Sequence, residues 1–391
     1  MSQPFAGIRV LDFTQVFAGP YASYQLALLG ADVIKIEKLG GEDSRSTNGK
    51  IGPKGDMTSP IFISTNGNKR GIALDLKQPE AIDAVKKLAE TADVVIENFR
   101  AGVMDRLGIG WDVLRGINPR LIYAAISGFG RVGPDAQTPA YDGKIQALSG
   151  IMSVTGYPEN GPTRAGFAVA DAAAGMTAAF AIASALFQRM ATGRGQLVEV
   201  SMLDSALSFL SPTVADWTFT GYRPVQYGNM AVSRRPTADL FKAKDSHLLL
   251  ACNTEGQWLA LVQTIGRKDL LDDPRFADWD LRKQHAAELR AILNEAFAGA
   301  TAAEWDEWLN KAGCPSSKIW SIPEVVEHPQ HEHRGVLPTV DGIKLVNAGF
   351  AFERDGPKLE RLAPSPGEHT EEVLREAGFS ETEIAALAKG I

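Results

Sequence analysis

The chain has 391 residues, of which 45% are hydrophobic and 22% are charged, and its formal net charge is −7. This composition is typical of a folded protein with room for two domains, and it argues against a disordered chain. The acidic balance disfavours a general nucleic-acid-binding protein, and two cysteines, Cys252 and Cys314, are too few for a disulfide framework or a zinc site.

Targeting and membrane signals are weak. The segment MSQPFAGIRVLDF has no basic stretch and carries Asp12 early, so it does not predict a secretory signal, and the cysteine usage fits a cytoplasmic setting. The apolar run over residues 165–188 is long enough to span a membrane. It is rich in alanine, contains the single charge Asp171 and has no second span, so it favours a buried core helix over a membrane partner.

The first part of the chain alternates between strand and helix patterns. IRVLDF predicts a strand, a helix begins near Gly19 and Pro20 and ends at Gly30, and ADVIKIE predicts a second strand. Further strands are predicted over residues 71–76, 92–99 and 121–127, with a helix over 79–91. Strands that alternate with helices predict an α/β fold with a parallel sheet covered on both faces.

The later part of the chain changes in character. Residues 168–191 predict a long helix, and LVEVSML predicts a strand that leads into another helix. Beyond residue 220 tryptophans cluster and short amphipathic helices follow between 256 and 312, so we predict a smaller domain over residues 225–325. In the tail, Ser380 and Glu383 form the pattern of a capping box at the start of the last helix.

A glycine-rich motif follows one of the predicted strands. Gly128, Gly130 and Gly133 have the GxGxxG spacing, but Pro134 and a polar stretch follow where a dinucleotide site needs a helix. The pattern therefore predicts a loop. The first strand–helix connection, QVFAGP, has only one glycine, and Glu37 at the end of the second strand is weak support by itself. A nicotinamide oxidoreductase is thus an alternative with little support.

The histidines are confined to the later part of the chain. None of the six precedes His247, and no GxSxG motif is present, which disfavours a serine hydrolase built on the parallel sheet. His328, His331 and His333 are spaced like metal ligands, but Pro329 works against helical presentation. We predict a solvated loop there and no metal site.

Basic residues flank the predicted strands. Lys69 and Arg70 precede one strand, and Arg100 and Arg106 follow another. Doubly wound sheets bind ligands at the carboxyl ends of their strands, and arginine and lysine are suited to phosphates. An ordinary solvated surface is the alternative for each residue taken alone.

Asp171 lies at the start of the predicted long helix, in the segment VADAAAG. A carboxylate there can cap the helix, and the positive end of the helix dipole favours its ionised form. A poorly hydrated carboxylate is also a capable nucleophile toward an activated acyl group. The residues alone leave both interpretations open.

Several long segments resemble, in order, the class III coenzyme A transferases, the CaiB/BaiF family that includes formyl-CoA and carnitine-CoA transferase-like enzymes. They are LDFTQVFAGPYASYQLALLGADVIKIE, NGNKRGIALDLK, ADVVIENFRAGVMDRLG, YDGKIQALSGIMSVTG and ADAAAGMTAAFAIASALFQRMATGRGQLVEVSMLD. The resemblance covers nearly the whole chain. It implies an enzyme that moves CoA between an acyl-CoA and a free carboxylic acid, with CoA as substrate and no tightly bound cofactor or metal.

The resemblance also implies site residues. In the family an aspartate attacks the acyl-CoA thioester and forms an anhydride and then an aspartyl-CoA thioester, and Asp171 stands at the matching position. Residues implied to bind CoA are Gln15, Lys38, Lys69, Arg70, Asn98, Arg100 and Arg106. Tyr141 and Asp142 are implied to contact the substrate.

The implied architecture is an interlocked homodimer. Each protomer would have a large Rossmann-like, CoA-binding domain from residues 1–224, a small α+β domain from 225–325, and a linker and C-terminal return to the large domain over 326–391. Some members carry consecutive glycines in a loop over the active site, whereas the nearest stretch here, CNTEGQW, has only Gly256. This departure leaves open how the anhydride would be shielded from water.

Two alternatives remain within CoA chemistry: an α-methylacyl-CoA racemase or epimerase, and a CoA-binding protein without catalysis. Racemases of this superfamily carry a histidine base where Tyr141 stands, and tyrosine is a poor base near neutral pH. The sequence does not identify the acyl group. Arg164, Arg234 and Arg235 are suited to a second carboxylate and hint at a dicarboxylic substrate.

Overall fold

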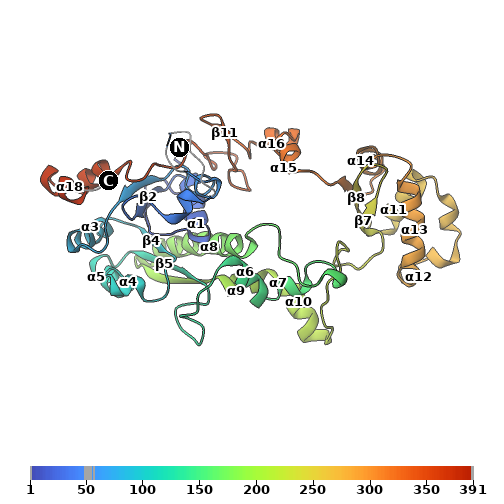
Figure 1. Cartoon of the computed structure of the whole chain (residues 1–391), viewed down its shortest axis with the longest axis horizontal. Coiled ribbons are helices and arrows are strands. Elements are labelled where there is room, and N and C mark those ends of the chain that lie inside the picture. The colour runs from blue at the N-terminus through green and yellow to red at the C-terminus, as the bar shows by residue number, and fades with distance from the viewer. Residues whose placement is uncertain (1, 48–54, 56–57, 389–391) are drawn as a thin grey trace. The chain divides into compact units, whose positions relative to one another are not determined.

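The computed structural model describes residues 2–47, 55 and 58–388, and the chain divides into two compact units (Figure 1). The larger unit comprises residues 1–152, 164–223 and 329–391, and the smaller unit comprises 153–163 and 224–328. The sequence places the segment 153–163 in the large domain, whereas in the structure it belongs to the smaller unit.

The larger unit is built on a six-stranded sheet in which every neighbouring pair is parallel. The strands are β1 (Arg9–Asp12), β2 (Asp32–Glu37), β3 (Arg70–Ala73), β4 (Val94–Glu97), β5 (Ile122–Ser127) and β6 (Gln196–Ser201). Their order is β3-β2-β1-β4-β5-β6, so the order reverses between β1 and β4. The predicted α/β class and parallel sheet are confirmed, and this strand order is that of dinucleotide-binding folds.

Helices cover both faces of this sheet because successive side chains of a strand point to opposite sides. Val10 belongs to a core shared with α1 (Ala18–Leu28) and α8 (Val169–Thr192). Its neighbour Leu11 belongs to a second core, shared with α3 (Pro79–Ala89) and α5 (Trp111–Ile117). Figure 1 shows these two groups of helices on opposite sides of the sheet.

Shorter elements complete the larger unit. They are η1 (Asp43–Ser46), α2 (Pro60–Ile63), α4 (Val103–Arg106), α6 (Asp142–Leu148), α9 (Met202–Phe209), α10 (Ser211–Ala215), η3 (Asp216–Thr220), α16 (Pro329–Arg334), β10 (Thr339–Val340), β11 (Ile343–Lys344), α17 (Thr370–Glu376) and α18 (Glu381–Leu387). Helix α7 (Ile151–Val154) lies at the boundary with the smaller unit. No helix begins in the glycine-rich segment after β5 until α6, so the predicted loop is confirmed.

The C-terminal segment packs against the edge strand β3. Arg70 of β3 forms ion pairs with Glu372 and Glu376 of α17, at 2.8 Å each. The backbone N–H of Gly71 donates to Nδ1 of His369 at 3.2 Å. The predicted capping box of Ser380 and Glu383 is present at the start of α18. Residues some 300 positions apart in sequence thus stabilise one edge of the sheet.

The smaller unit is an antiparallel sheet with helices. Its strands β7 (Ala238–Lys242), β8 (His247–Ala251) and β9 (Ser316–Lys318) pair in the order β7-β8-β9. Its helices are η2 (Pro158–Asn160), α11 (Glu255–Thr264), η4 (Lys268–Leu271), η5 (Pro274–Phe276), α12 (Trp279–Gln284), α13 (Ala286–Phe297), α14 (Ala302–Lys311) and α15 (Ile322–Val326). Trp258, Phe297 and Trp305 are buried in its core.

The histidine-rich segment HPQHEH differs from the prediction. It was expected to be a loop because of Pro329, but residues Pro329–Arg334 form helix α16. Proline is tolerated in the first turn of a helix, where its missing N–H would have no helical partner. The loop prediction was therefore wrong because it treated the proline as lying inside a helix rather than at its start.

Helix α8 is the one helix, among the described residues, that is long and apolar enough to cross a membrane by length and composition. Half of its most apolar window is buried inside the structure. The buried side includes Ala174, Ala178 and Ile182, which pack in the core with α1 and the sheet. This packing is typical of the core helix of a globular domain.

Candidate active site

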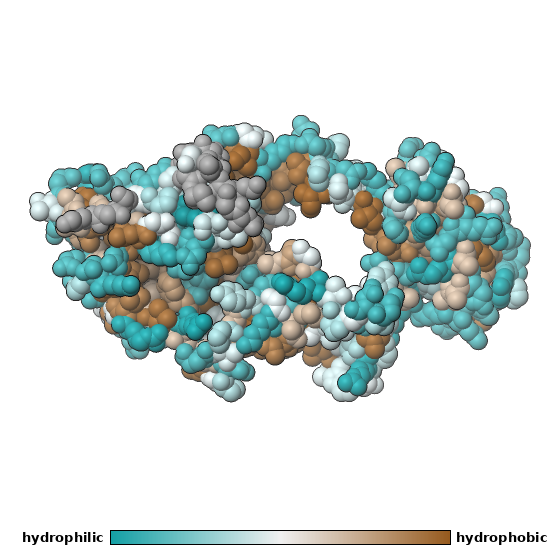
Figure 2. All heavy atoms as spheres, viewed as in Figure 1, coloured by the Kyte–Doolittle hydropathy of each residue, from teal (hydrophilic) through white to brown (hydrophobic). Residues whose placement is uncertain are grey.

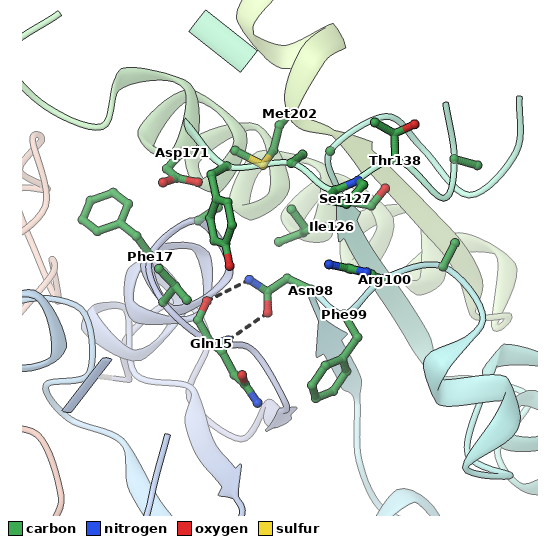
Figure 3. Close-up of a pocket in the computed structure, with 18 residues that line it drawn as sticks. Gln15, Phe17, Asn98, Phe99, Arg100, Ile126, Ser127, Thr138, Asp171 and Met202 are labelled. Carbon is green, nitrogen blue, oxygen red and sulfur yellow. Dashed lines mark hydrogen bonds between the residues drawn. The ribbon is translucent and has the colours of Figure 1, made fainter. Parts of the chain in front are cut away.

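A pocket of about 270 Å³ opens where the strand order of the large sheet reverses (Figure 3). Its lining comes from segments that follow the strands: residues 15–18 after β1, 98–101 after β4 and 126–128 at the end of β5. Asp171, Met202 and loop residues between Ala136 and Tyr141 complete it. Doubly wound sheets bind their ligands at this place, because the connections on either side of the reversal diverge and leave a crevice.

Asp171 reaches this pocket because α8 packs closely on α1. A Cβ atom placed on Gly175 would lie 2.7 Å from the backbone oxygen of Ala18, so only glycine allows this approach. Asp171 precedes Gly175 by four residues and therefore lies on the same face of α8. The contact brings its carboxylate beside the segment Val16–Ala18 at the start of α1, as Figure 3 shows.

The start of α8 is capped by a distant carboxylate. Oδ1 of Asp142, which is itself buried, accepts from the backbone N–H of Ala170 at 2.9 Å and of Asp171 at 3.4 Å. Oδ2 of Asp142 accepts from Nε2 of Gln146 at 2.6 Å and pairs with Arg164 at 3.3 Å. Asp171 is the third residue of the helix, so the interpretation of Asp171 as an N-cap is wrong.

The environment of Asp171 favours its neutral form. Burial, together with the smaller effect of the neighbouring Asp142 carboxylate, raises the pKa of Asp171 to about 7. No hydrogen-bond donor reaches its carboxylate oxygens within the part of the chain that the structure describes. Near neutral pH the group is therefore divided between both forms, and its ionised form is poorly solvated.

This pKa predicts a pH-dependent stability. The native pKa of Asp171, about 7, lies above the ordinary value of 3.8, so between these two values the native state binds more protons than the unfolded state. The contribution of the raised pKa of Asp171 to the free energy of unfolding is fully present below pH 4 and is lost as the pH rises through 7. We expect Asp171→Asn to exceed the wild type in stability by on the order of 1 kcal/mol at pH 8, with a smaller difference at pH 4. Thermal unfolding at both pH values tests this, and an equal difference at both would contradict the raised pKa.

The structure brings five of the residues implied by the resemblance to one place. Gln15, Asn98, Arg100, Tyr141 and Asp171 line the pocket. The side chain of Arg100 is exposed at the pocket, and Tyr141 is 75% exposed. Asp142 adjoins them through the first turn of α8. The pocket therefore offers a carboxylate, a guanidinium and a phenol to a ligand.

Two of the implied CoA-binding residues, Lys69 and Arg70, do not line the pocket. Their side chains bind other groups of the larger unit instead. The fully buried Nζ of Lys69 donates to Asp12 at 2.9 Å, and also to the side chains of Ser23 and Asn66 and the carbonyl oxygen of Pro20. Arg70 forms ion pairs with Asp32 of β2 and with α17. These contacts support a structural role, and a phosphate-binding role finds no support in them.

Lys38 and Arg106 are exposed but also lie outside the pocket lining. Lys38 follows β2 and pairs with Asp43 at 2.5 Å, while Arg106 ends α4. An exposed pair of this kind is readily exchanged for another anion. Both positions therefore remain open to the distal part of a long ligand.

Sequence reasoning missed several residues that line the pocket. They include Val16, Phe17, Phe99, Ser127 and Met202. Each of them follows or ends a strand of the sheet, so the rule that ligands bind at carboxyl ends of strands was the signal that could have found them. Their side chains carry no charge, so a pattern of basic residues at the strand ends does not identify them.

The comparisons with known proteins agree with one another. Residues 5–370 match the family described as CoA-transferase family III. The chain is 39% identical to an acetyl-CoA:oxalate CoA-transferase from Acetobacter aceti over 91% of this chain and 93% of that one. It is 35% identical to a succinate–glutarate CoA-transferase from Agrobacterium fabrum over 95% of each chain. A crystal structure of a CaiB/BaiF family protein from Brucella suis, 32% identical, superposes with a TM-score of 0.88 over 96% of this chain and all of that chain.

Proposed function

Because the chain belongs to CoA-transferase family III, we propose that it transfers CoA from an acyl-CoA to a free carboxylate by covalent catalysis at Asp171. The observation that carries this proposal is the placement of Asp171. Its carboxylate is half-buried, has a raised pKa and lies in the pocket at the reversal of strand order. A poorly solvated carboxylate of this kind is suited to attack a thioester.

The proposed reaction proceeds through exchanges of acyl groups that need no other reactant. A carboxylate oxygen of Asp171 attacks the thioester carbon, the carbon–sulfur bond breaks, and CoA leaves as the thiolate, which gives an acyl–aspartyl anhydride. The thiolate then attacks the aspartyl carbonyl, releases the donor acid and forms an aspartyl-CoA thioester. The acceptor carboxylate repeats the two steps in reverse, which restores the Asp171 carboxylate and forms the new acyl-CoA.

The start of α1 is suited to stabilise the tetrahedral intermediates. Its first N–H groups have no helical partners, and no side chain caps them among the described residues. The segment Val16–Ala18 lines the pocket beside Asp171. Backbone N–H groups and the positive end of a helix dipole favour a developing oxyanion without reorganisation. We assign this role to the backbone, and we assign contact with the CoA phosphates to Arg100, with Lys38 and Arg106 for the distal phosphates.

Arg164 supports a dicarboxylic acceptor. Its guanidinium is 60% exposed, and its ion pair with Asp142 holds it next to the first turn of α8. A second carboxylate of the substrate could pair with the same guanidinium. The relatives described above are named for oxalate, succinate and glutarate, all of which have two carboxylates. Tyr141 replaces the histidine of a racemase in the pocket lining, which disfavours that alternative.

An exposed apolar stripe supports a homodimer. Phe180, Phe187 and Met190 of α8 are 76%, 77% and 82% exposed. Their spacing places them along one side of the helix, opposite the buried side. On the face drawn in Figure 2, hydrophobic residues lie at the surface of this unit among hydrophilic ones. Large apolar side chains exposed along one side of a helix favour a site of association, and a second copy of the chain is the proposed occupant.

The proposed function predicts CoA transfer to dicarboxylates. Purified protein is incubated with acetyl-CoA or succinyl-CoA and with isotopically labelled oxalate, glutarate or butyrate, and the acyl-CoA products are measured by mass spectrometry. We expect labelled acyl-CoA with the dicarboxylates and at least about tenfold less with butyrate, because one charged contact of the acid is lost. Asp171→Asn is the control that should abolish transfer. Exchange of the α-hydrogen without transfer of CoA would instead indicate a racemase.

A further inference from the structure

We propose that Asn98 is a positioning residue, which together with Asp12 and Lys35 holds the segment Thr14–Val16 so that the start of α1 faces Asp171. The proposal rests on the proposed function, because this positioning affects turnover only if Asp171 reacts in the pocket. The resemblance implies that Asn98 binds CoA, whereas its side-chain hydrogen bonds go to the protein backbone. The following observations carry the new role.

Val16 adopts a backbone conformation that its residue type disfavours. Its φ angle is +70°, in the left-handed region, and Val16 is β-branched. Such a conformation costs roughly 1–3 kcal/mol and persists only where the surroundings determine it. The Val16 side chain is 42% exposed in the pocket lining, so core packing does not hold it. The residues before it must therefore be fixed by other contacts.

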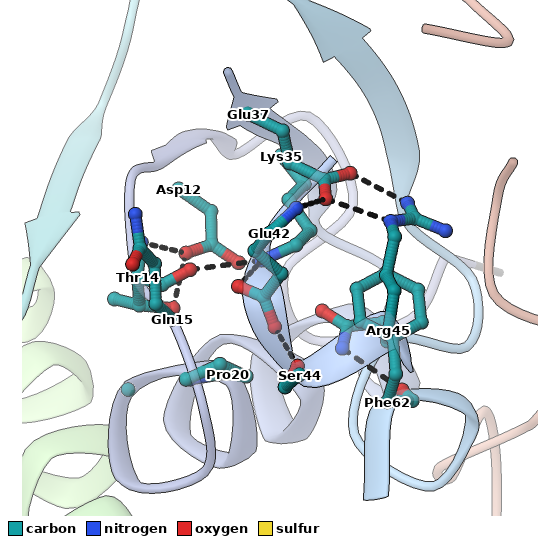
Figure 4. A network of polar contacts seen from close by, with 12 residues as sticks. Asp12, Thr14, Gln15, Pro20, Lys35, Glu37, Glu42, Ser44, Arg45 and Phe62 are labelled. Atoms are coloured by element: carbon teal, nitrogen blue, oxygen red, sulfur yellow. Dashed lines mark hydrogen bonds and ion pairs between the residues drawn. The ribbon is translucent and has the colours of Figure 1, made fainter. Parts of the chain in front are cut away.

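Thr14 is fixed by two fully buried charged residues (Figure 4). Oδ1 of Asp12 accepts from the backbone N–H of Thr14 at 2.9 Å and from its hydroxyl at 2.5 Å. Nζ of Lys35 donates to the carbonyl oxygen of Thr14 at 2.8 Å. The backbone N–H and the carbonyl oxygen of Thr14 are thus both bound by side chains that come from β1 and β2.

Gln15 is fixed by the side chain of Asn98. Oδ1 of Asn98 accepts from the backbone N–H of Gln15, and Nδ2 donates to its carbonyl oxygen, both at 2.8 Å. Figure 3 shows the two bonds as a closed pair on one side of the pocket. Asn98 directly follows β4, so the amide extends the pairing of β1 with β4 beyond the end of the ladder. Two bonds to one residue restrict its rotation more than either bond alone.

The close contact between Thr14 and Gly19 couples the position of Thr14 to that of α1. A Cβ atom at Gly19 would lie 2.4 Å from the Cβ atom of Thr14, so Thr14 packs directly on the first turn of the helix. The chain between Thr14 and Gly19 must then reverse within a few residues, and the left-handed Val16 makes that reversal. The hydrogen bonds that fix Thr14 and Gln15 therefore determine where the free N–H groups of residues 16–18 point.

The test compares Asn98→Ala with the matched variant Asn118→Ala. Asn118 also bonds the backbone through its side chain, to Ala89 and Ala92 at 3.1 and 2.8 Å, but it lies before β5, at the opposite end of that strand from the pocket. We expect Asn98→Ala to lower kcat about tenfold to a hundredfold, because loss of orientation acts on the reacting geometry, with KM for acyl-CoA changed less than about threefold. Asn118→Ala should leave both constants within about twofold.

Hydrogen–deuterium exchange provides a readout that does not depend on activity. Asn98→Ala should speed exchange in the peptide that contains residues 14–18, while Asn118→Ala should speed it only around its own partners. If the wild type is active and Asn98→Ala has an unchanged kcat, the positioning role is overturned. If Asn98→Ala instead raises KM for acyl-CoA, the result overturns the positioning role and indicates that Asn98 binds CoA directly. Absence of CoA transfer by the wild type would contradict the proposed function. Hydrogen–deuterium exchange would still show whether Asn98 restrains residues 14–18.

Discussion

Replacing Asp171 with asparagine should lower the rate of CoA transfer by at least about a thousandfold, because the variant lacks the nucleophile while its amide keeps the shape of the side chain. Removing the nucleophile stops the first step, so kcat falls and substrate binding need not change. The carboxylate is half-buried beside the start of α1, and burial and the neighbouring Asp142 carboxylate raise its pKa. Steady-state kinetics with an acyl-CoA donor and a dicarboxylate acceptor measures the effect.

Trapping identifies the group that reacts. Hydroxylamine added during turnover should convert an aspartyl anhydride or thioester into a hydroxamate, and peptide mass spectrometry should place it on Asp171. The same treatment of Asp171→Asn should give no hydroxamate. Modification of another residue, or full activity in Asp171→Asn, would refute the assignment. The ionised form of Asp171 is required, so kcat/KM of the wild type should rise with pH through about 7.

Replacing Lys69 with methionine should destabilise the larger unit by about 3–5 kcal/mol, because it leaves Asp12 buried with one of its two cations removed. Both side chains are fully buried, and four acceptor oxygens surround the three N–H donors of the Lys69 ammonium. Burial lowers the pKa of Lys69 to about 8 despite the nearby Asp12 carboxylate, which raises it. Denaturant unfolding of the purified variant measures the loss.

A second substitution separates the ion pair from packing. Asp12→Asn combined with Lys69→Met removes both charges, and the double variant should recover part of the stability lost by Lys69→Met alone. Arg100→Ala provides the contrast, since its exposed side chain at the pocket should change stability by less than about 0.5 kcal/mol while raising KM for acyl-CoA. A Lys69→Met variant as stable as the wild type, with only KM raised, would favour the phosphate-binding role instead.

The candidate site was predictable only in part. Asp171 stood out because it is a single charge in a long apolar stretch, and the resemblance named Gln15, Asn98 and Tyr141, which the structure also places in the pocket. The basic pair Lys69–Arg70 looked equivalent to Arg100 in the sequence. A charged residue beside a strand carries no information about whether its partner is a ligand or an internal carboxylate.

By itself the sequence determined the alternation of strands and helices, the parallel α/β class, the long apolar helix and the capping box at Ser380, because these features depend on local periodicity and local hydrogen bonds. Only the tertiary structure decided the partners of the charged residues. Asp12 pairs with Lys69, which lies 57 residues later in the sequence, and Asp142 caps a helix that begins 27 residues after it. Such pairs form where the sheet and its helices bring distant segments together, and no local pattern records them. The carboxylate of Asp171 owes its burial and raised pKa to the same long-range packing.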